Sequence, residues 1–583
     1  MKALLVFLAA VVAAPVALLA ATPFNVVEAG IPEIRAALEQ KRLTSRELVT
    51  LYLARIGMYE DKLHCIITVN PNALKEADER DRERAQGRIR GPLHGIPIAL
   101  KDNILTHDIV TTGGALAFDG YLPPYDATLV KNLRDAGAII IAKTGLSELA
   151  NWVAGAPTPM PANYNAMRGF GYNPYDPRRD PREGSNDGRP VLTTGGSSSG
   201  VGTAASFWLG NVGSETSGSI LSPANQNMLA AIKPTVGRIS RYGVIPITAD
   251  QDTAGPMART VTDAAIMFGA LESATPDPND AATKLCIPAP GRDYTKFLKA
   301  DGLKGARIGI PRGLFYERAK IPQRAGAPEP GAGPGGTGRG GRGGGNGDPL
   351  TPEQARAMTE AIDVLKQQGA IIVDPVDLPS ISTQDPDKNF ALWNQCSGLN
   401  SVKGRDANCS AVLKYGMKRD FNAFLATLGP SAPVKTLTEL REWNITHITA
   451  GAIRFGQSQL DISDEMDLSG DRARYEHDRA KDIELAGTNG IDAAMKTNNL
   501  DALLFPGPNG AGIAAKPGYP TVIVPFAMVP NNANPPFPAG FEAKPAPFGV
   551  SFTGMSCSEP KLLQLGYAFE QATKRRVPPP ATP

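Results

Sequence analysis

Residues 193–220 read TTGGSSSGVGTAASFWLGNVGSETSGSI and place serines among glycines in a chain that has 5 histidines. Two of these serines are candidate nucleophiles. The run GSSSG fits the G-x-S-x-G motif and would select Ser198. The run TSGSI, further along the same stretch, would select Ser219. Because the two serines imply different folds and different chemistry, the surrounding residues have to decide between them.

The first alternative, a G-x-S-x-G esterase with an α/β-hydrolase fold, lacks its partners in this sequence. That motif needs a strand directly before it and an aspartate and a histidine later in the chain. The preceding residues, GSNDGRPVLTTG (184–195), are typical of a loop. The histidines that come later are His447 and His477, and the charged run around His477 indicates a solvent-facing helix. The sequence therefore disfavours Ser198 as the attacking group.

The amino-acid composition indicates a globular protein and argues against some classes of partner. The chain has 583 residues, of which 42% are hydrophobic and 20% are charged, and its formal net charge is +2. These values are typical of a globular protein with a large core. The near-neutral charge argues against nucleic acid or an anionic membrane surface as a partner.

The N-terminus predicts export. Residues 1–21 contain one lysine followed by an apolar run that ends in alanines, which is the pattern of a secretory signal peptide cleaved after Ala20 or Ala21. An uncleaved membrane anchor is the alternative, because the run is close to the minimum length for spanning a bilayer. We therefore expect a periplasmic or extracellular protein with no stable membrane insertion after cleavage.

The cysteines do not predict a metal site. None of the five, Cys65, Cys286, Cys396, Cys409 and Cys557, has the spacing of a metal ligand set. An oxidising compartment permits disulfides, and proximity in sequence makes Cys396–Cys409 the favoured pair. The alternative is five buried thiols that act as small apolar residues.

Predicted helices and strands alternate along the chain. One helix is predicted after Thr44, which together with Glu47 has the spacing of a capping box. Residues 126–142 predict a helix capped by Asp126 and then a strand, and residues 351–373 repeat this order. This alternation predicts an α/β layered fold. Further buried strands are predicted at residues 96–100, 306–310, 500–505 and 521–526.

One internal segment has a different composition. Residues 324–349 are mostly glycine and proline. They hold too little apolar surface to offset their ordering entropy, which predicts a disordered surface loop inside the domain. An arginine–glycine segment that binds RNA is the alternative, and the export signal argues against it.

Lys101 ends the apolar run GIPIAL, so its amine would lie at the end of a buried strand. Desolvation lowers the pKa of a lysine and can make it a base. A lysine that leaves the strand end for water is the plainer alternative. The residues around Lys101 favour the catalytic interpretation over the solvent-exposed one, because they form the first of a series of motifs.

These motifs resemble the amidase signature family. The resemblance runs from about residue 28 to residue 576, and it is closest to the bacterial peptide-amidase branch. The motifs that carry it are GIPIALKDNI (95–104), AKTGLSELAN (142–151), TTGGSSSG (193–200), GSETSGSILSPA (213–224), IKPTVGRIS (232–240), QDTAGPMART (251–260) and GVSFTGMSCSEPKLLQLGYAFEQAT (549–573).

The resemblance implies a single large fold of three layers, α/β/α, with a central mixed β-sheet covered by helices. On this basis the signature domain spans residues 25–576 and includes the 324–349 insert. Residues 375–520 match the family poorly and are expected to form the variable wall of the substrate pocket. Residues 577–583 are expected to be a flexible tail.

The resemblance also implies a catalytic triad of two serines and a lysine. Lys101 matches the family lysine, Ser197 the bridging serine that follows a cis peptide bond, and Ser219 the nucleophile. Ser198 is then a neighbour that hydrogen-bonds within the loop. The backbone N–H groups of Thr216, Ser217 and Gly218 are expected to form the oxyanion hole for the reaction.

The implied reaction is amide hydrolysis through an acyl-enzyme, with no metal and no organic cofactor. The expected partner is a small-molecule or peptide amide, and the protein is expected to be a monomer or a homodimer. Four aromatic residues, Trp393, Trp443, Phe505 and Tyr519, are candidates for the pocket wall, with plain core as the alternative.

Two departures from the family pattern keep other functions open. Ser219 lies 22 positions after Ser197, about two fewer than the family spacing. Two residues lost inside a helix would rotate the rest of that helix by about 200°, so the loss should be absorbed at a helix end near Gly210–Gly213. The acidic residue before the oxyanion loop is Glu215, where many members have aspartate. The alternatives are a non-catalytic binding protein and an amidotransferase A-type subunit, and the export signal argues against the second.

Overall fold

The computed structural model of the chain describes residues 24–185, 187–196, 198–323 and 350–583. The predicted signal peptide and the predicted insert at 324–349 lie outside these residues. Within the described part, no helix combines the length and the apolar character needed to cross a bilayer.

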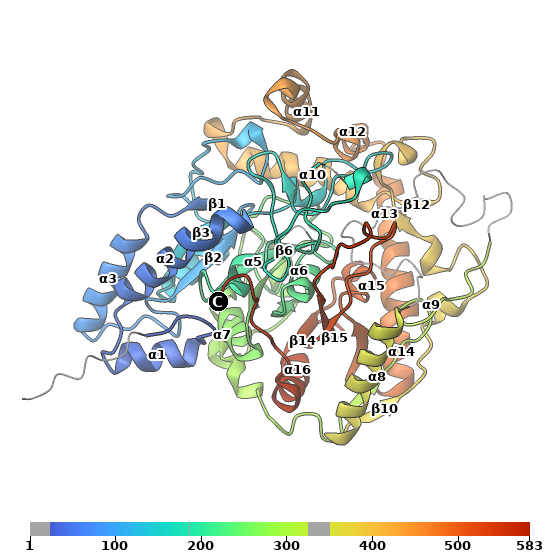
Figure 1. The fold of residues 1–583 in the computed structure, drawn as a ribbon. Coiled ribbons are helices and arrows are strands. Elements are labelled where there is room, and N and C mark those ends of the chain that lie inside the picture. The colour runs from blue at the N-terminus through green and yellow to red at the C-terminus, as the bar shows by residue number, and fades with distance from the viewer. Residues whose placement is uncertain (1–23, 186, 197, 324–349) are drawn as a thin grey trace, which may run out of the picture.

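The described strands build one large mixed sheet, which confirms the predicted fold class (Figure 1). Eleven strands are hydrogen-bonded in the order β1-β3-β2-β6-β8-β7-β14-β15-β13-β9-β10. The bounds of these strands are β1 (Ile66–Val69), β2 (Pro97–Lys101), β3 (Ile139–Thr144), β6 (Gly210–Glu215), β7 (Ala230–Lys233), β8 (Thr253–Ala258), β9 (Arg307–Gly309), β10 (Ile371–Val373), β13 (Ala502–Pro506), β14 (Thr521–Val529) and β15 (Ala546–Thr553). Two small two-stranded sheets pair β4 (Tyr164–Asn165) with β5 (Gly169–Phe170) and β11 (Asn394–Gln395) with β12 (Cys409–Ser410).

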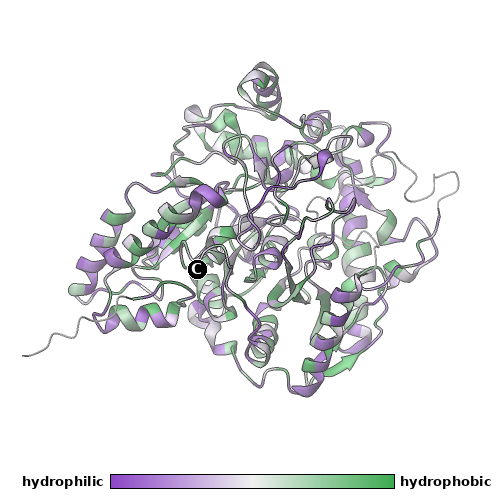
Figure 2. Cartoon of the chain, in the orientation of Figure 1, coloured by the Kyte–Doolittle hydropathy of each residue, from purple (hydrophilic) through white to green (hydrophobic). Residues whose placement is uncertain are grey.

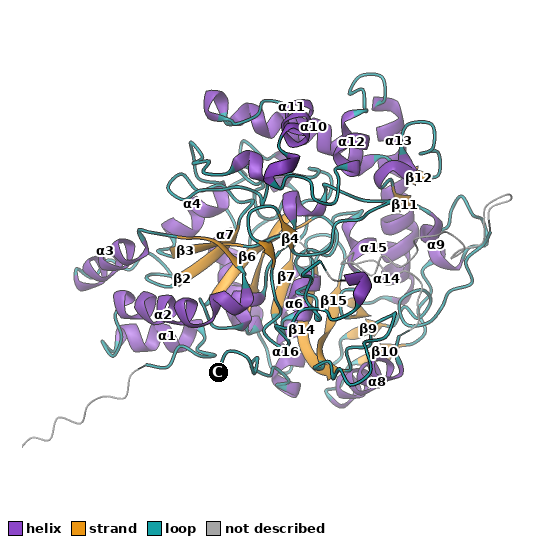
Figure 3. Ribbon diagram, turned by 45° about the horizontal axis from the view of Figure 1, so that its top comes forward, coloured by secondary structure: helices purple, strands orange, loops and turns teal. Residues whose placement is uncertain are grey.

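Helices surround the sheet (Figure 3). Their bounds are α1 (Ile31–Glu39), α2 (Ser45–Leu63), α3 (Ala73–Ala85), α4 (Thr128–Asp135), α5 (Val201–Ala204), α6 (Leu221–Gln226), α7 (Val261–Leu271), α8 (Pro352–Gln367), α9 (Pro379–Ser382), α10 (Val412–Thr427), α11 (Leu437–Thr446), α12 (Ser458–Asp464), α13 (Arg472–Ile483), α14 (Ala493–Asn498), α15 (Ala511–Ala515) and α16 (Glu559–Thr573).

Strand β14 shows how the three layers are made. Successive side chains of a strand point to opposite faces of the sheet. Val522 and Val524 face Gly566 of α16, whereas Ile523 packs in a buried cluster with Leu221 of α6. Helices α6 and α16 therefore cover opposite faces. In Figure 2 the central strands are mostly green, whereas the outlying α3 is mostly purple.

The local signals of the sequence are largely confirmed. Thr44 and Glu47 form the predicted capping box at the start of α2, and Gly137 adopts a φ of 87° directly after α4. The predicted cap at Asp126 is wrong. Ala127 is the N-cap of α4, because the Asp126 carboxylate accepts the backbone N–H of His107 and pairs with an arginine of α4 instead.

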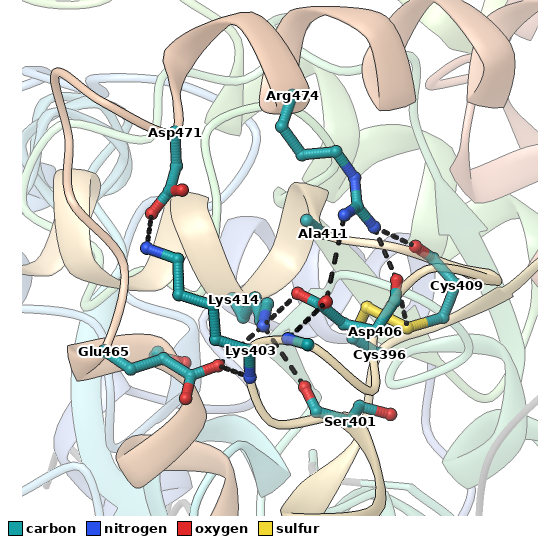
Figure 4. Close-up of polar contacts among 12 residues, drawn as sticks. Cys396, Ser401, Lys403, Asp406, Cys409, Ala411, Lys414, Glu465, Asp471 and Arg474 are labelled. Carbon is teal, nitrogen blue, oxygen red and sulfur yellow. Dashed lines mark hydrogen bonds and ion pairs between the residues drawn. A yellow bond between two sulfur atoms is a disulfide. The ribbon is translucent and has the colours of Figure 1, made fainter.

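The predicted disulfide Cys396–Cys409 is present, and it lies beside a group of charged residues under α10 (Figure 4). Lys414 of α10 is fully buried, and its Nζ contacts Asp406 Oδ2 at 2.9 Å and Glu465 Oε1 at 2.8 Å. A buried ammonium is tolerated only when it is paired and hydrogen-bonded. These bonds and the disulfide hold α10 in place, which matters because α10 forms one wall of the cavity described below.

The cysteines and the C-terminal segment differ from the prediction. A second disulfide joins Cys286 to Cys557 across 271 positions, and Cys65 is a buried free thiol. The predicted flexible tail at 577–583 is instead held against the domain. Arg55 donates to the carbonyl oxygens of Thr582 at 2.8 Å and Pro583 at 3.0 Å, because its buried guanidinium needs acceptors that helix α2 does not offer.

Candidate active site

Lys101 lies at the end of β2, between the parallel neighbours β3 and β6, and its side chain is fully buried. Its Nζ donates to the carbonyl oxygen of Ser214 at 3.2 Å and to Ser214 Oγ at 2.9 Å. Burial lowers the pKa of Lys101 to about 7, although the negative charges of Asp252 and Glu215 oppose that shift. An amine with this pKa exists as both base and acid near neutral pH, which is what a proton carrier requires.

The glycine-rich loop before Ser197 lies against the segment that carries Ser219. A Cβ added to Gly195 would lie 2.3 Å from Pro223 Cα, and one added to Gly196 would lie 3.0 Å from Ser219 Cα. Only glycine fits so close an approach. Ser197 itself, with the cis bond predicted before it, lies outside the described residues. The structure thus brings the immediate neighbour of Ser197 into contact with Ser219.

Ser198, the serine of the G-x-S-x-G run, is fully buried and has a structural partner. Its Oγ donates to the carbonyl oxygen of Ser214 at 3.0 Å and accepts the Ser214 backbone N–H at 3.2 Å. The expected hydrogen bond within the loop is therefore wrong, because both bonds reach strand β6. They join the loop to the residue that binds Lys101.

The turn from Thr216 to Ser219 presents unused donors. Within the described residues, the backbone N–H groups of Thr216, Ser217, Gly218 and Ser219 donate no hydrogen bond to protein atoms. Gly218 has a φ of 96°, which a side chain would disfavour, and Ser219 is half-buried. Four neighbouring donors without a protein partner in this part of the structure could together bind one oxygen atom.

Glu215 holds this turn from behind. Its Oε2 accepts the backbone N–H of Ile220 at 2.6 Å and of Leu221 at 2.9 Å, and Ser222 N donates to the carbonyl oxygen of Gly218 at 2.8 Å. The carboxylate therefore binds the two N–H groups that follow Ser219. It binds none of the N–H groups of residues 216–219.

Between the two proposed catalytic serines the described chain forms one short helix and one strand. Helix α5 (Val201–Ala204) has a single turn, and the chain then loops to reach the strand at Gly210. Trp208 fills the space under the loop, since a Cβ on Gly202 would lie 2.2 Å from its ring. Gly210–Gly213 lies within β6 and not at a helix end, and the place where the shorter spacing is accommodated stays a prediction.

A cavity of about 390 Å³ opens beside these residues. Ser214, Thr216 and Asp252 line one end of it, and most of the remaining wall is apolar. Helix α10 supplies Phe424 and Thr427 to this wall. The cavity wall thus includes residues of the 375–520 region, and the role of that region as the wall of a substrate pocket stays a prediction. Aromatic and aliphatic lining residues are Tyr125, Tyr242, Val244, Ile245, Pro246 and Ile247.

The four aromatic candidates for the pocket wall lie elsewhere in the described structure. Trp393 donates its Nε1–H to Asp482 at 2.8 Å, and Trp443 stacks on His447 with the ring centroids 3.8 Å apart. Phe505 is fully buried in the main core, and Tyr519 packs against it from a half-buried position. Trp393 and Phe505 are therefore buried core residues, whereas Trp443 and Tyr519 are half-buried and pack against the core, and none of the four lines this cavity.

Sequence reasoning missed two contributors to the site. Ser214, which binds Lys101, and Asp252, which contacts Thr216, were not singled out. Both lie inside the family motifs, in GSETSGSILSPA and QDTAGPMART respectively. The alternation of a strand would have found Ser214, since Ser214 and Thr216 share one face of the β6 end and Glu215 takes the other.

Comparisons with known proteins identify relatives of this chain. The sequence profile of the family named Amidase matches residues 47–327. A probable amidase of Arabidopsis thaliana is 33% identical over 563 residues, covering 95% of this chain and 92% of the relative. The A-type subunit of the glutamyl-tRNA(Gln) amidotransferase of Thermosynechococcus vestitus is 30% identical over 560 residues, covering 93% of this chain and 98% of the relative.

The same relationship holds in three dimensions. The structure of a peptide amidase from Stenotrophomonas maltophilia superposes with a TM-score of 0.76 and 33% identity, covering 96% of this chain and 99% of the other. Relatives at this identity, matched over nearly the whole length of both chains, share a fold and a family. The chain belongs to the amidase signature family of enzymes that hydrolyse amides.

Proposed function

We propose that this protein is an exported amidase that cleaves small, aryl or peptide C-terminal amides through an acyl-enzyme on Ser219. The free N–H groups of residues 216–219, directly before a half-buried serine, are the observation that carries the proposal. They offer a site for the negative oxygen of a tetrahedral intermediate, and each such donor typically contributes about 10²–10³-fold in turnover.

The proposed mechanism moves one proton out and back. Ser219 Oγ attacks the amide carbonyl carbon while its proton passes through Ser197 to the neutral amine of Lys101. The carbonyl oxygen becomes negative and is held by the backbone N–H groups of the turn. Lys101 returns the proton through Ser197 to the leaving nitrogen, the C–N bond breaks, and the acyl-enzyme remains. Water then attacks the ester by the same route and releases the carboxylic acid and Ser219.

A panel of substrates tests the proposed function. C-terminally amidated peptides, aliphatic amides and anilides should release ammonia or amine, whereas the matching free-acid peptides should release none. Mass spectrometry of enzyme trapped at low pH should find one acyl group on the tryptic peptide that contains Ser219. Failure to cleave any amide, together with no labelling by a fluorophosphonate, would overturn the proposal in favour of a non-catalytic binding protein.

The second candidate is an amidotransferase A-type subunit, which the similarity to the Thermosynechococcus protein suggests. Two features favour the amidase. The 1–21 leader has the pattern of an export signal, and two disulfides suit an oxidising compartment rather than the cytoplasm. N-terminal sequencing of protein recovered from outside the cytoplasm should find a chain that begins at Ala21 or Thr22. A full-length chain that stays in the cytoplasm would contradict export.

A further inference from the structure

Asp252 stands next to the proposed oxyanion turn because of strand pairing. Strands β6 and β8 are antiparallel, and Glu215 lies opposite Thr253. The next residues outward, Thr216 and Asp252, therefore face each other as a cross-strand pair. The Thr216 hydroxyl donates to Asp252 Oδ1 at 2.5 Å, and both side chains line the cavity.

The second oxygen of the Asp252 carboxylate also accepts hydrogen bonds. Its Oδ2 accepts the backbone N–H groups of Ile247 at 2.8 Å and Thr248 at 2.9 Å. Asp252 therefore joins the loop that forms the cavity wall to the first residue of the oxyanion turn. Three donors converge on one buried carboxylate, and such bonds favour its ionised form.

The charge of Asp252 also acts on Lys101. Its negative charge is the larger of the two that raise the pKa of Lys101 against desolvation, and Glu215 is the other. Burial raises the pKa of Asp252 itself to about 6, and Arg241 opposes that rise. Arg241 is in turn paired with Asp280, so its positive charge is shared between the two carboxylates.

We propose that Asp252 is a positioning residue for amide cleavage, which orients the 216–219 turn through the Thr216 hydroxyl and sets a negative charge beside Lys101. This inference rests on the proposed function of Lys101 and Ser219. It adds a residue that contacts neither the reacting atoms nor the proton path. A purely structural brace of the cavity loop is the competing explanation.

Asp252→Asn and a matched control, Asp250→Asn, separate these explanations. Asp250 lies in the same loop, accepts from Thr248 Oγ1 at 3.0 Å and from the Tyr475 hydroxyl at 2.9 Å, and pairs with Arg419 at 3.0 Å. Both substitutions remove one negative charge and weaken the same loop. Of the two aspartates, Asp252 is the one that contacts Thr216.

We expect Asp252→Asn to lower kcat on an amidated peptide by about 10–100-fold with a small change in KM. The acidic limb of the pH profile of kcat/KM should move about one unit to lower pH, because a lost negative charge lowers the pKa of Lys101. Asp250→Asn should lower thermal stability to a similar degree and leave that limb in place. Equal kcat and equal pH limbs in the two variants would overturn the proposal.

A second pair of variants covers a folding failure of Asp252→Asn. Thr216→Val removes the hydroxyl at nearly constant volume, and Thr216→Ser keeps it. The serine variant should retain most of the turnover that the valine variant loses. Equal losses would contradict the orienting role of the hydroxyl.

A readout independent of turnover separates this inference from the proposed function. The pKa of Lys101 can be measured by NMR of ¹³C-labelled lysine in the wild type and in Asp252→Asn. A lower pKa of Lys101 in the variant would support a negative charge of Asp252 beside Lys101, even if the enzyme cleaves no amide. An unchanged value in an active enzyme would refute the inference and leave the proposed function intact.

Discussion

Ser219→Ala should lower kcat for amide hydrolysis by roughly 10⁶-fold, to the level that the remaining oxyanion donors support. Ser219 lies at the end of a turn of backbone donors without a protein partner among the described residues, and its Cα lies against Gly196, the neighbour of Ser197. Without its Oγ no acyl-enzyme can form, while the turn and the cavity stay in place. Steady-state ammonia release, together with intact-mass measurement of enzyme treated with a fluorophosphonate, checks this result.

Ser198→Ala is the matched control for the nucleophile. Ser198 lies in the same loop and fits the G-x-S-x-G pattern, yet both bonds of its buried hydroxyl go to Ser214. The variant should lose some stability and still take up one equivalent of the probe on Ser219. Labelling that survives in Ser219→Ala and disappears in Ser198→Ala would reverse the assignment of the nucleophile.

Lys101→Met should lower kcat by about 10⁴-fold, because the proton of Ser219 then has no base to receive it. The pKa of Lys101 is lowered by burial to about 7, and the neutral amine is the active form. In the wild type, kcat/KM should therefore rise with pH from below about 6 and level off above about 8. The methionine variant should show no rise through this range.

The stability of the same variant should move the opposite way. The unfolded chain holds the lysine proton up to its ordinary pKa of 10.5, while the folded chain releases it near 7. At neutral pH the folded state is thus penalised, and this penalty grows as the pH falls below 10.5 and is complete below 7. A methionine of similar volume removes the penalty, so the midpoint of thermal unfolding at neutral pH should rise. A variant that is both inactive and strongly destabilised would indicate a structural lysine.

Lys143→Met provides the contrast. Lys143 is equally buried and contacts Asp102 Oδ1 at 3.2 Å and the Thr111 hydroxyl. Removing one partner of a buried ion pair leaves an uncompensated charge, which typically costs about 3–5 kcal/mol of stability. The midpoint of thermal unfolding should therefore be higher than that of the wild type for Lys101→Met and lower for Lys143→Met.

Helix ends and strands that depend on a few neighbouring residues could be predicted from the sequence. The capping box of Thr44 and Glu47 and the helix stop at Gly137 depend on bonds within one turn of the chain, and both are present. The strand that ends in Lys101 could be predicted from a short apolar run. Asp126 had the same kind of signal and failed, since a loop and an arginine that fold back onto it compete for its carboxylate.

The sequence alone therefore determined the α/β class, the family motifs and the burial of the strand that ends in Lys101. The order of the strands decided the rest. Asp252 meets Thr216 because β8 runs antiparallel beside β6, and Cys286 meets Cys557 across 271 positions. Glu215 accepts the N–H groups of Ile220 and Leu221, while those of residues 216–219 have no protein partner within the described part of the chain. Such contacts depend on which surfaces the packed core brings together, and no local pattern of residue types encodes that choice.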